Sequence, residues 1–373
     1  MAPRERLRVA LDANPLVHQR TGIGQFTAQL LALLATRGDI DACAYAITRR
    51  GRRTVARQVP LGVRAATSPL PARVAHTLWS SLSWPRVEHW TGEIDVVHAT
   101  NFVAPPARAP VVVTVHDLAF VTSPELCQRE TREYEPQLRR AISRGATVHA
   151  VSDYVAGAAR THFGLDGDRV VRVYEGAAPM LGAGTAGTGH ALAGGDEYVL
   201  ALATVEPRKN LPRLVRAFDA IAADHPRLLL VVAGADGWDV DAFDAAVRAA
   251  HASARVRRLG YVSDAERADL LAGARALAYP SLDEGFGHPP LEAMAARVPV
   301  VASCAGALPE ILGDAALLVD PRDEAALADA LQRILVDTEL RRQLVERGEA
   351  RALAFPWGRA VDEMVDLYRR VAA

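Results

Sequence analysis

The stretch YVLALATVEPRKNLPRLVRAFDAI, residues 198–221, decides the fold because it contains one complete strand-to-helix unit. Its first six residues are small or apolar, as in a strand that is buried on both faces. Its last ten place apolar side chains at helical spacing, and a turn that contains a proline lies between the two. A buried strand that leads directly into an amphipathic helix is the building block of parallel α/β sheets.

Units of the same kind recur along the whole chain of 373 residues. Short apolar runs alternate with longer helical patterns, which predicts an α/β protein with two Rossmann-like, doubly wound domains. Each run ends in small, polar or charged residues, at the sheet edge where such folds bind ligands. The predicted strands are 7–11, 95–99, 111–115 and 148–151 in the first half, and 198–203, 228–233, 256–259, 276–279 and 298–302 in the second.

The boundaries of the domains follow from composition. Residues 1–176 are predicted to form the N-terminal domain and residues 197–355 the C-terminal domain. Residues 177–196 are rich in glycine, alanine and threonine without a period, which indicates a linker. Residues 356–373 show helical spacing, and we expect this helix to cross back to the N-terminal domain. The two domains would then face each other across a cleft.

Composition and charge exclude several classes of protein. Half of the residues are apolar and 23% are charged, which is ordinary for a globular protein, and a net charge of −1 gives no overall attraction to nucleic acid. Three widely spaced cysteines support neither a disulfide framework nor a zinc site. No stretch approaches the roughly 20 apolar residues of a membrane span, and the N-terminus lacks a long apolar segment. We predict a cytoplasmic protein.

Residues 48–90 differ from the rest of the chain in charge. The segment contains eight arginines and one acidic residue, Glu88, which gives a local charge of +7. It also contains Trp79, Trp84 and Trp90. Indoles interleaved with arginines suit an anionic membrane surface, so we predict peripheral contact with the inner face of the membrane through this segment. The alternative is a solvated arginine face above tryptophans that pack in a core.

Lys209 is the only lysine among 43 basic residues, and it follows Arg208 in the turn of the opening stretch. Codon bias toward arginine can remove lysine from a sequence for no chemical reason. The presence of a single lysine at this position can therefore be chance. However, a guanidinium and an ammonium side by side suit a diphosphate, because one offers a planar fork and the other a point charge. We predict that both residues bind a diphosphate.

A second motif, YPSLDEGFGHPPLEAMA, spans residues 279–295. A strand runs into a glycine-bearing loop, and Pro289 or Pro290 suits the first turn of the helix that follows. Backbone N–H groups at a helix start can hold a phosphate. Glu284 precedes the loop and Glu292 lies in the helix, so that one carboxylate can reach a sugar hydroxyl and the other a ribose hydroxyl.

With these motifs the chain resembles the retaining GT-B glycosyltransferases of family 4, also called group 1, and especially their bacterial mannosyltransferase-like branch. The resemblance covers nearly the whole chain. It rests on RTGIGQFT (20–27), DVVHATNF (95–102), VVTVHDLA (112–119) and AVSDYV (150–155) in the first half, and on EPRKN (206–210), GYVSD (260–264), the segment from Glu284 to Glu292 and PVVASCAGALPE (299–310) in the second.

The resemblance implies an acceptor-binding N-terminal domain and a C-terminal domain that binds a sugar nucleotide. Catalytic roles fall on His116 at the sugar end of the cleft, on Glu284, which would hold donor-sugar hydroxyls, and on Arg208 and Lys209 at the diphosphate. Glu292 would bind the ribose. The predicted donor-binding residues are Gly22, Gly24, Arg208, Lys209, Tyr261, Val262, Glu284, Gly285, Phe286, Gly287 and Glu292.

The resemblance also implies a front-face reaction without metal or cofactor, in which the departing diphosphate helps to deprotonate the acceptor. GDP-mannose is the favoured donor, and UDP- or dTDP-sugars stay open. Many relatives carry an arginine shortly before the EPRK motif, whereas this chain has Ala203 and Thr204 there, so Arg208 would have to replace it. A carbohydrate, lipid-linked or small-molecule acceptor, a sugar-nucleotide epimerase or hydrolase, and a non-catalytic binding protein also stay open.

Overall fold

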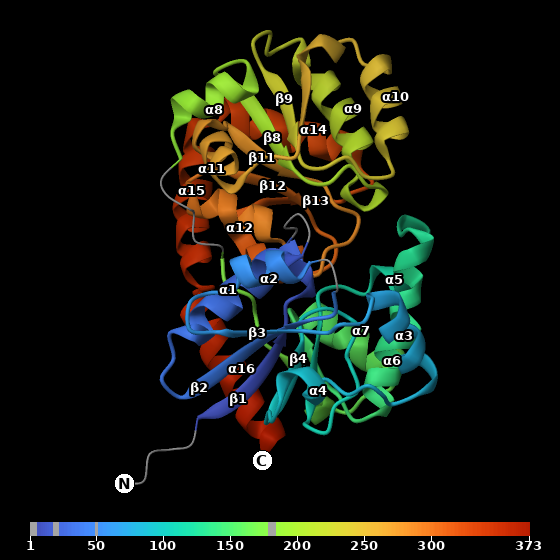
Figure 1. The fold of residues 1–373 in the computed structure, drawn as a ribbon. Coiled ribbons are helices and arrows are strands. Elements are labelled where there is room, and N and C mark those ends of the chain that lie inside the picture. Colours follow the sequence, from blue (N-terminus) through green and yellow to red (C-terminus); the bar gives the residue numbers. More distant parts are fainter. Residues whose placement is uncertain (1–5, 18–21, 49–50, 178–183) are drawn as a thin grey trace. The chain divides into compact units, whose positions relative to one another are not determined.

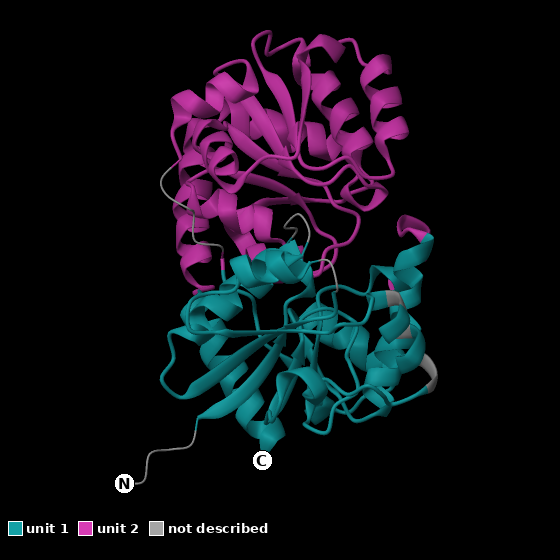
Figure 2. Ribbon diagram, viewed as in Figure 1, with its two compact units in different colours: residues 1–121, 129–176, 357–373 teal, residues 122–128, 177–356 magenta. Residues whose placement is uncertain are grey.

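The computed structural model describes residues 6–17, 22–48, 51–177 and 184–373. The chain divides into two compact units (Figure 2). Unit 1 comprises residues 1–121, 129–176 and 357–373, and unit 2 comprises residues 122–128 and 177–356. The last helix of the chain therefore belongs to the same unit as the N-terminal half. None of the described helices is long and apolar enough to cross a membrane.

Unit 1 contains parallel strands with helices between them. Its strands are β1 (Leu7–Asp12), β2 (Ile40–Ala46), β3 (Arg64–Thr67), β4 (Val96–Ala99), β5 (Val111–Val115), β6 (Thr147–Ala150) and β7 (Val170–Arg172), and its helices are α1 (Gly22–Ala35), α2 (Arg52–Gln58), α3 (Ala72–Ser81), α4 (Glu88–Thr91), α5 (Ala119–Thr122), α6 (Tyr134–Ser143), α7 (Asp153–Phe163) and α16 (Trp357–Ala372). The sheet order is β3-β2-β1-β4-β5-β6-β7 (Figure 1). The order reverses between β1 and β4, which makes the sheet doubly wound.

Unit 2 repeats this plan. Its strands are β8 (Tyr198–Leu202), β9 (Leu229–Ala233), β10 (Val256–Gly260), β11 (Ala276–Tyr279), β12 (Val300–Ser303) and β13 (Leu317–Val319), and its helices are α8 (Ala186–Ala193), α9 (Leu211–Ala222), α10 (Val240–Ala249), α11 (Asp264–Gly273), α12 (His288–Ala295), α13 (Leu308–Leu312), α14 (Glu324–Val336) and α15 (Thr338–Leu353). The sheet order is β10-β9-β8-β11-β12-β13, again parallel, and it reverses between β8 and β11. Two Rossmann-like sheets were predicted, and the structure confirms them.

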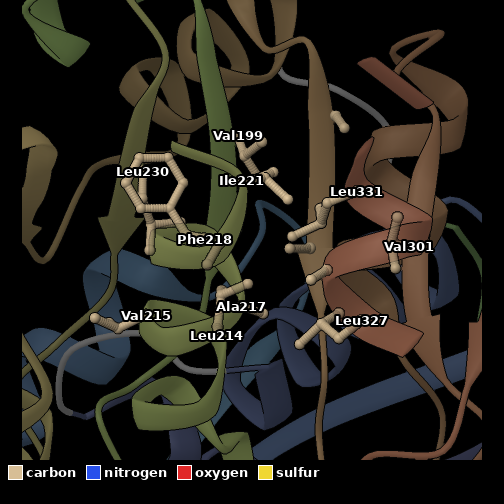
Figure 3. Close-up of a cluster of buried hydrophobic side chains, with 14 of the residues drawn as sticks. Val199, Leu214, Val215, Ala217, Phe218, Ile221, Leu230, Val301, Leu327 and Leu331 are labelled. Atoms are coloured by element: carbon tan, nitrogen blue, oxygen red, sulfur yellow. The ribbon is translucent and has the colours of Figure 1, made fainter. Parts of the chain in front are cut away.

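The core of unit 2 lies between the sheet and helices α9 and α14 (Figure 3). Leu214 and Phe218 lie one turn apart on α9, and Leu327 and Leu331 lie one turn apart on α14; all four side chains are buried. Fully burying a leucine or phenylalanine side chain contributes about 1.5–3 kcal/mol. This packing fixes the strand-to-helix unit of residues 198–221 and so holds the turn between them.

The core of unit 1 includes the last helix of the chain. Val361, Met364, Val365 and Tyr368 are the apolar positions predicted for this helix, and all are buried on α16 among side chains of α1 and the sheet. The hydroxyl of Tyr368 also contacts His98 Nδ1 at 2.6 Å. The helical spacing of the sequence therefore identified the face of α16 that packs.

Four strands of the described chain, β2, β3, β7 and β13, were missing from our prediction. The sequence of β2 is IDACAYA and that of β3 is RAAT, so both are rich in alanine, which has no preference for strands. Strands β7 and β13 have three residues each, too few to show a period. Pairing with neighbouring strands, which sequence spacing does not reveal, forms all four.

Residues 178–183 of the expected linker over residues 177–196 lie outside the described residues, and much of the remainder is helical. Residues 186–193 form helix α8, which packs against α11 in unit 2. A Cβ atom at Gly184 would lie 2.0 Å from Ala268 O, and one at Gly189 would lie 2.0 Å from Asp269 O. Glycine thus allows a close approach to α11, and the composition that indicated a linker instead serves helix packing.

Candidate active site

Both predicted motifs of unit 2 follow neighbouring strands at the centre of its sheet. The turn with Lys209 follows β8, and the loop with Glu284 follows β11. The strand order reverses between these two strands. In open α/β sheets, ligands bind outside the carboxyl ends of the strands at such a switch point.

Asn210 links the turn after β8 to the loop after β11 through a hydrogen bond of its side chain. Its backbone takes a left-handed conformation with φ of 56°, which asparagine tolerates better than most residues. Its amide nitrogen Nδ2 donates to Pro280 O at 3.0 Å and to Pro321 O at 2.8 Å. The backbone carbonyl of Arg208 accepts from Leu282 N at 2.7 Å. The positions of Arg208 and Lys209 are therefore fixed by the loop after β11.

Lys209 and Arg208 form a compact charged cluster with two carboxylates and a tyrosine. Lys209 Nζ lies 2.6 Å from Glu284 Oε2 and donates to Tyr279 OH at 2.9 Å. The Tyr279 hydroxyl donates to the same Glu284 oxygen at 2.8 Å. Arg208 contacts Glu206 Oε1 at 3.0 Å and Glu284 Oε1 at 3.4 Å. Two cations and two anions balance, so a diphosphate would have to draw the cations from their carboxylates.

The cluster stays ionised although it is largely buried. Burial and Arg208 act to lower the pKa of Lys209, but the negative charges of Glu284 and Glu206 outweigh them, and the pKa is raised. Burial acts to raise the pKa of Glu284, yet Lys209 and Arg208 bring it down to about 2. Burial and the Glu284 carboxylate raise the pKa of Tyr279, so its hydroxyl keeps its proton.

Gly306 allows the loop around Glu284 to keep its shape. A Cβ atom at Gly306, whose φ is 61°, would lie 2.3 Å from Glu284 O and 2.6 Å from Glu284 N. Ala307 N donates to Glu284 O at 2.8 Å. Gly306 lies in the segment 299–310 that carries the resemblance, so the role of that segment includes supporting Glu284.

The start of α12 offers fewer N–H donors than we expected. Pro289 lies in the first turn as predicted, and Pro290 follows it directly. Proline has no N–H group, so two of the groups counted on for a phosphate are absent. Gly287 precedes the helix with a φ of 106° that favours glycine. A phosphate bound at this helix start would therefore depend more on the side chains of Arg208 and Lys209.

Glu292 is buried in α12, with 2% of its side chain exposed. Its Oε2 lies 3.3 Å from Arg267 Nε on α11. Neither carboxylate oxygen accepts a well-aligned hydrogen bond from the described residues. A buried carboxylate with open acceptor positions suits a pair of ligand hydroxyls, because hydroxyls can fill those positions.

The other predicted donor-binding residues of unit 2 fall into two groups. Phe286 is buried between Gly285 and Gly287 and packs edge-on against Phe355 at 5.8 Å, so its ring has a structural role. Tyr261 and Val262 follow β10, at the same carboxyl edge of the sheet but two strands from β8, and Tyr261 is 48% exposed. The structure does not bring them into the Lys209 cluster.

Gly22 and Gly24 open helix α1 in unit 1, while Arg20 and Thr21 of the same motif lie outside the described residues. A Cβ atom at Gly22 would meet no atom of the other described residues within 4 Å, apart from those of its own helix backbone. The fold of unit 1 thus leaves room for a side chain at this position. A requirement for glycine would have to come from a ligand that approaches the backbone.

His116 follows β5 in unit 1, and both of its ring nitrogens face oxygen atoms. Nδ1 lies 2.9 Å from Glu175 Oε1, and Nε2 lies 2.8 Å from Thr100 O. Because a backbone carbonyl only accepts, Nε2 carries a proton. The contact at Nδ1 is an approach to a carboxylate oxygen and does not have the geometry of a hydrogen bond. The side chains of His116 and Glu175 are 12% and 3% exposed, so this contact is shielded from water.

Two further histidines near His116 are uncharged. Burial lowers the pKa of His98 well below its usual value and that of His149 to about 4. Thr114 Oγ1 bridges them, at 2.6 Å from His98 Nε2 and 2.9 Å from His149 Nδ1. Among these three histidines, only His116 has a carboxylate as its partner.

Comparison with known proteins places the chain in a family. A model described as "Glycosyl transferases group 1" matches residues 188–351, and one described as "Glycosyltransferase Family 4" matches residues 20–179. The chain belongs to the group 1 and family 4 glycosyltransferases. This enzyme is 28% identical to O-antigen chain mannosyltransferase B of Escherichia coli, over 97% of this chain and all of that one. It is 42% identical to an MMP α-(1→4)-mannosyltransferase of Mycolicibacterium hassiacum, over 30% of this chain and 28% of that one.

Solved structures show that this glycosyltransferase has the GT-B fold. A sucrose-phosphate synthase from Thermosynechococcus elongatus matches with a TM-score of 0.77 and 22% identity, over 98% of this chain and 99% of that one. Anabaena HepE, solved in complex with UDP and glucose, matches with a TM-score of 0.75 and 18% identity, over 98% of this chain and all of that one.

Sequence reasoning missed several residues of this glycosyltransferase that contact predicted site residues, among them Tyr279 and Glu175. Tyr279 ends β11 and contacts both Lys209 and Glu284, and its place at the end of a central strand was the available signal. Glu175 contacts His116 from a position 59 residues away in the chain. No local pattern marks Glu175, because the contact forms only when β5 and the segment after β7 are brought together.

Proposed function

We propose that this glycosyltransferase moves a mannosyl group from GDP-mannose to a hydroxyl of a glycan, glycolipid or small-molecule acceptor, with retention of configuration. The observation that carries the proposal is the pairing of Arg208 and Lys209 with Glu284 at the switch point of unit 2. The mannose donor is supported by the likeness to O-antigen chain mannosyltransferase B over 97% of the chain. UDP- and dTDP-sugars are the alternative donors.

The chemistry requires stabilisation of a leaving group rather than a protein nucleophile. The bond from C1 of the sugar to the diphosphate breaks, the acceptor oxygen bonds to C1, and the acceptor proton passes to the departing diphosphate. Arg208 and Lys209 stabilise the charge that grows on the diphosphate, which is the kind of contact that lowers a reaction barrier most. Glu284, held by Tyr279 when Lys209 turns to the diphosphate, positions the sugar.

Thermal denaturation with GDP, GDP-mannose, UDP, UDP-glucose and dTDP, without divalent cations, tests the donor. A ligand at about 100 times its dissociation constant adds roughly 2.7 kcal/mol to the stability of the folded state. Stabilisation by the GDP ligands alone supports GDP-mannose. A response to UDP or dTDP keeps the chemistry and replaces the donor, whereas no response to any of them would contradict a sugar-nucleotide site.

Two further measurements separate this proposal from its rivals. Release of GDP from GDP-mannose should require an added acceptor. Equal release without one would indicate a hydrolase, and conversion of GDP-mannose into another GDP-sugar would indicate an epimerase. Glu284→Ala should lower the rate of transfer while free GDP binds as in the wild type, because Glu284 is assigned to the sugar. Equal loss of GDP affinity would show that this division of roles is wrong.

A further inference from the structure

An exposed groove in unit 1 combines apolar and cationic side chains. It has a volume of about 440 Å³, and most of its lining residues lie in the segment that joins α3 to α4. Leu82 and Trp84 are 53% and 55% exposed, which is unusual for side chains of this size. The groove is lined by Leu82, Ser83, Trp84, Arg86, His89 and Arg108.

The three tryptophans of the basic segment have different environments. Trp79 is buried, and its Nε1 donates to Pro85 O at 3.0 Å. Trp90 packs against the core around Val87. Trp84 stands at the surface, with its ring edge-on to His89 at 6.0 Å. Two of the indoles therefore serve the core, and Trp84 is the one available to a partner.

The groove carries a net positive charge. Within the described residues, neither Arg86 nor Arg108 forms an ion pair. Glu88 is the nearby acid, but its Oε1 accepts from Arg108 N at 2.5 Å and from Ala109 N at 3.1 Å, and its Oε2 is buried. Its carboxylate thus faces the backbone. Two guanidinium groups remain beside two exposed apolar side chains.

We propose that this groove docks the protein on an anionic lipid bilayer. Trp84 and Leu82 enter the boundary between headgroups and acyl chains, where an amphipathic indole is stable. Arg86 and Arg108 bind the phosphates of anionic headgroups, for which a guanidinium fork is well shaped. Reversible membrane binding needs apolar insertion and charge attraction together, and the groove supplies both.

Co-sedimentation of the full chain with vesicles tests the docking surface. We expect binding to vesicles of equal parts phosphatidylcholine and phosphatidylglycerol and none to phosphatidylcholine alone. Each arginine near an anionic surface contributes about a factor of five to partitioning, so R86Q/R108Q should bind about 25-fold more weakly. Trp84→Ala should reduce binding by about fivefold or more and abolish the vesicle-induced blue shift of the tryptophan fluorescence.

Matched variants in unit 2 serve as controls. R248Q/R257Q removes two exposed arginines without ion pairs among the described residues, and Trp238→Ala removes an indole that is 43% exposed; both should bind vesicles as the wild type does. Equal binding to both kinds of vesicle, no binding, or equal losses in groove and control variants would overturn the proposal. So would displacement by inorganic phosphate at constant ionic strength. Vesicle binding needs no sugar nucleotide, so its failure would leave the proposed transfer reaction untouched.

Discussion

Positive charge is presented in two different ways in this molecule. In unit 2, Arg208 and Lys209 are 17% and 11% exposed, and each has a carboxylate within 3.4 Å. In unit 1, the described arginines of residues 52–108 include no ion pair at all, and most are exposed at the surface. The first arrangement is neutral until a ligand enters, whereas the second attracts anions from a distance.

The difference teaches which ligands each region can select. A buried, paired cation is released only by a ligand whose charge replaces that of its carboxylate, and the fixed geometry then favours one shape of anion. Exposed, unpaired arginines hold no fixed geometry and respond to the charge density of a surface. On the two proposals made above, the molecule would combine a specific anion site in unit 2 with a diffuse one in unit 1.

The largest expected effect comes from removing the buried ammonium. Lys209→Ala should lower kcat by about 10²-fold or more, the usual result of losing one preorganised donor to developing charge. Lys209→Arg is the matched variant, because it keeps the charge but not the compact ammonium. Steady-state kinetics of mannosyl transfer measures both. Turnover of Lys209→Ala within a few-fold of the wild type would reject its role at the diphosphate.

The second effect concerns stability in acid. The pKa of Glu284 is about 2 in the folded state against 4.5 for the ordinary group, so its stabilising charge is fully present above pH 4.5 and is lost as the pH falls toward 2. The difference in unfolding free energy between wild type and Glu284→Gln should therefore shrink by about 3 kcal/mol over this range, at about 1.4 kcal/mol per pKa unit. Denaturant titrations at several pH values measure it; a constant difference would contradict the paired cluster.

A smaller effect is expected at the buried pair of unit 1. Glu175→Gln should lower kcat about tenfold with little change in KM for the donor, because His116 loses the buried carboxylate charge beside its ring. Glu135→Gln is a matched control, since Glu135 pairs with His162 at the same 2.9 Å in a more exposed setting. Nitrogen-15 NMR of the imidazole should report a changed environment of the His116 ring in Glu175→Gln alone. Equal kcat in the two variants would remove Glu175 from the site.

The smallest effect should come from one hydroxyl. Tyr279→Phe leaves the ring in place and removes the contacts with Lys209 and Glu284, so we expect kcat to fall several-fold, which corresponds to about 1 kcal/mol, the net contribution of a typical hydrogen bond. Tyr198→Phe is the control: its hydroxyl is buried in the neighbouring strand and donates to Leu270 O at 2.5 Å. This variant should lose stability but keep its kcat. Equal losses of kcat in both would indicate a purely structural role for Tyr279.

The sequence predicted the elements that its own periodicity marks. Alternation of apolar runs and helices identified both sheets, and the spacing of Val361, Met364, Val365 and Tyr368 identified the packed face of α16. It did not predict the alanine-rich strand β2, whose formation depends on pairing with β1. It also mistook the glycines before and within α8 for a linker, because spacing alone does not show that glycine permits a close contact with α11.

The candidate site was predictable where its residues are neighbours in the chain. Arg208 and Lys209 are adjacent, and Glu284 lies five residues after Tyr279, so two short motifs pointed to one cluster. The partner of His116 was not predictable, since Glu175 is distant in sequence and no pattern connects them. The sequence shows both prolines of α12. It does not show where the helix begins, and only the structure reveals that both prolines lie in the first turn and remove two N–H donors from it.

The most direct test of the account is a calorimetric titration of GDP into the wild type and into Lys209→Ala, with EDTA present. The account predicts that the wild type binds GDP without a divalent cation and that Lys209→Ala binds it at least about tenfold more weakly, since a hydrogen bond to a charged group is lost. Equal affinities in the two proteins would contradict the assignment of Lys209 to the diphosphate of the donor.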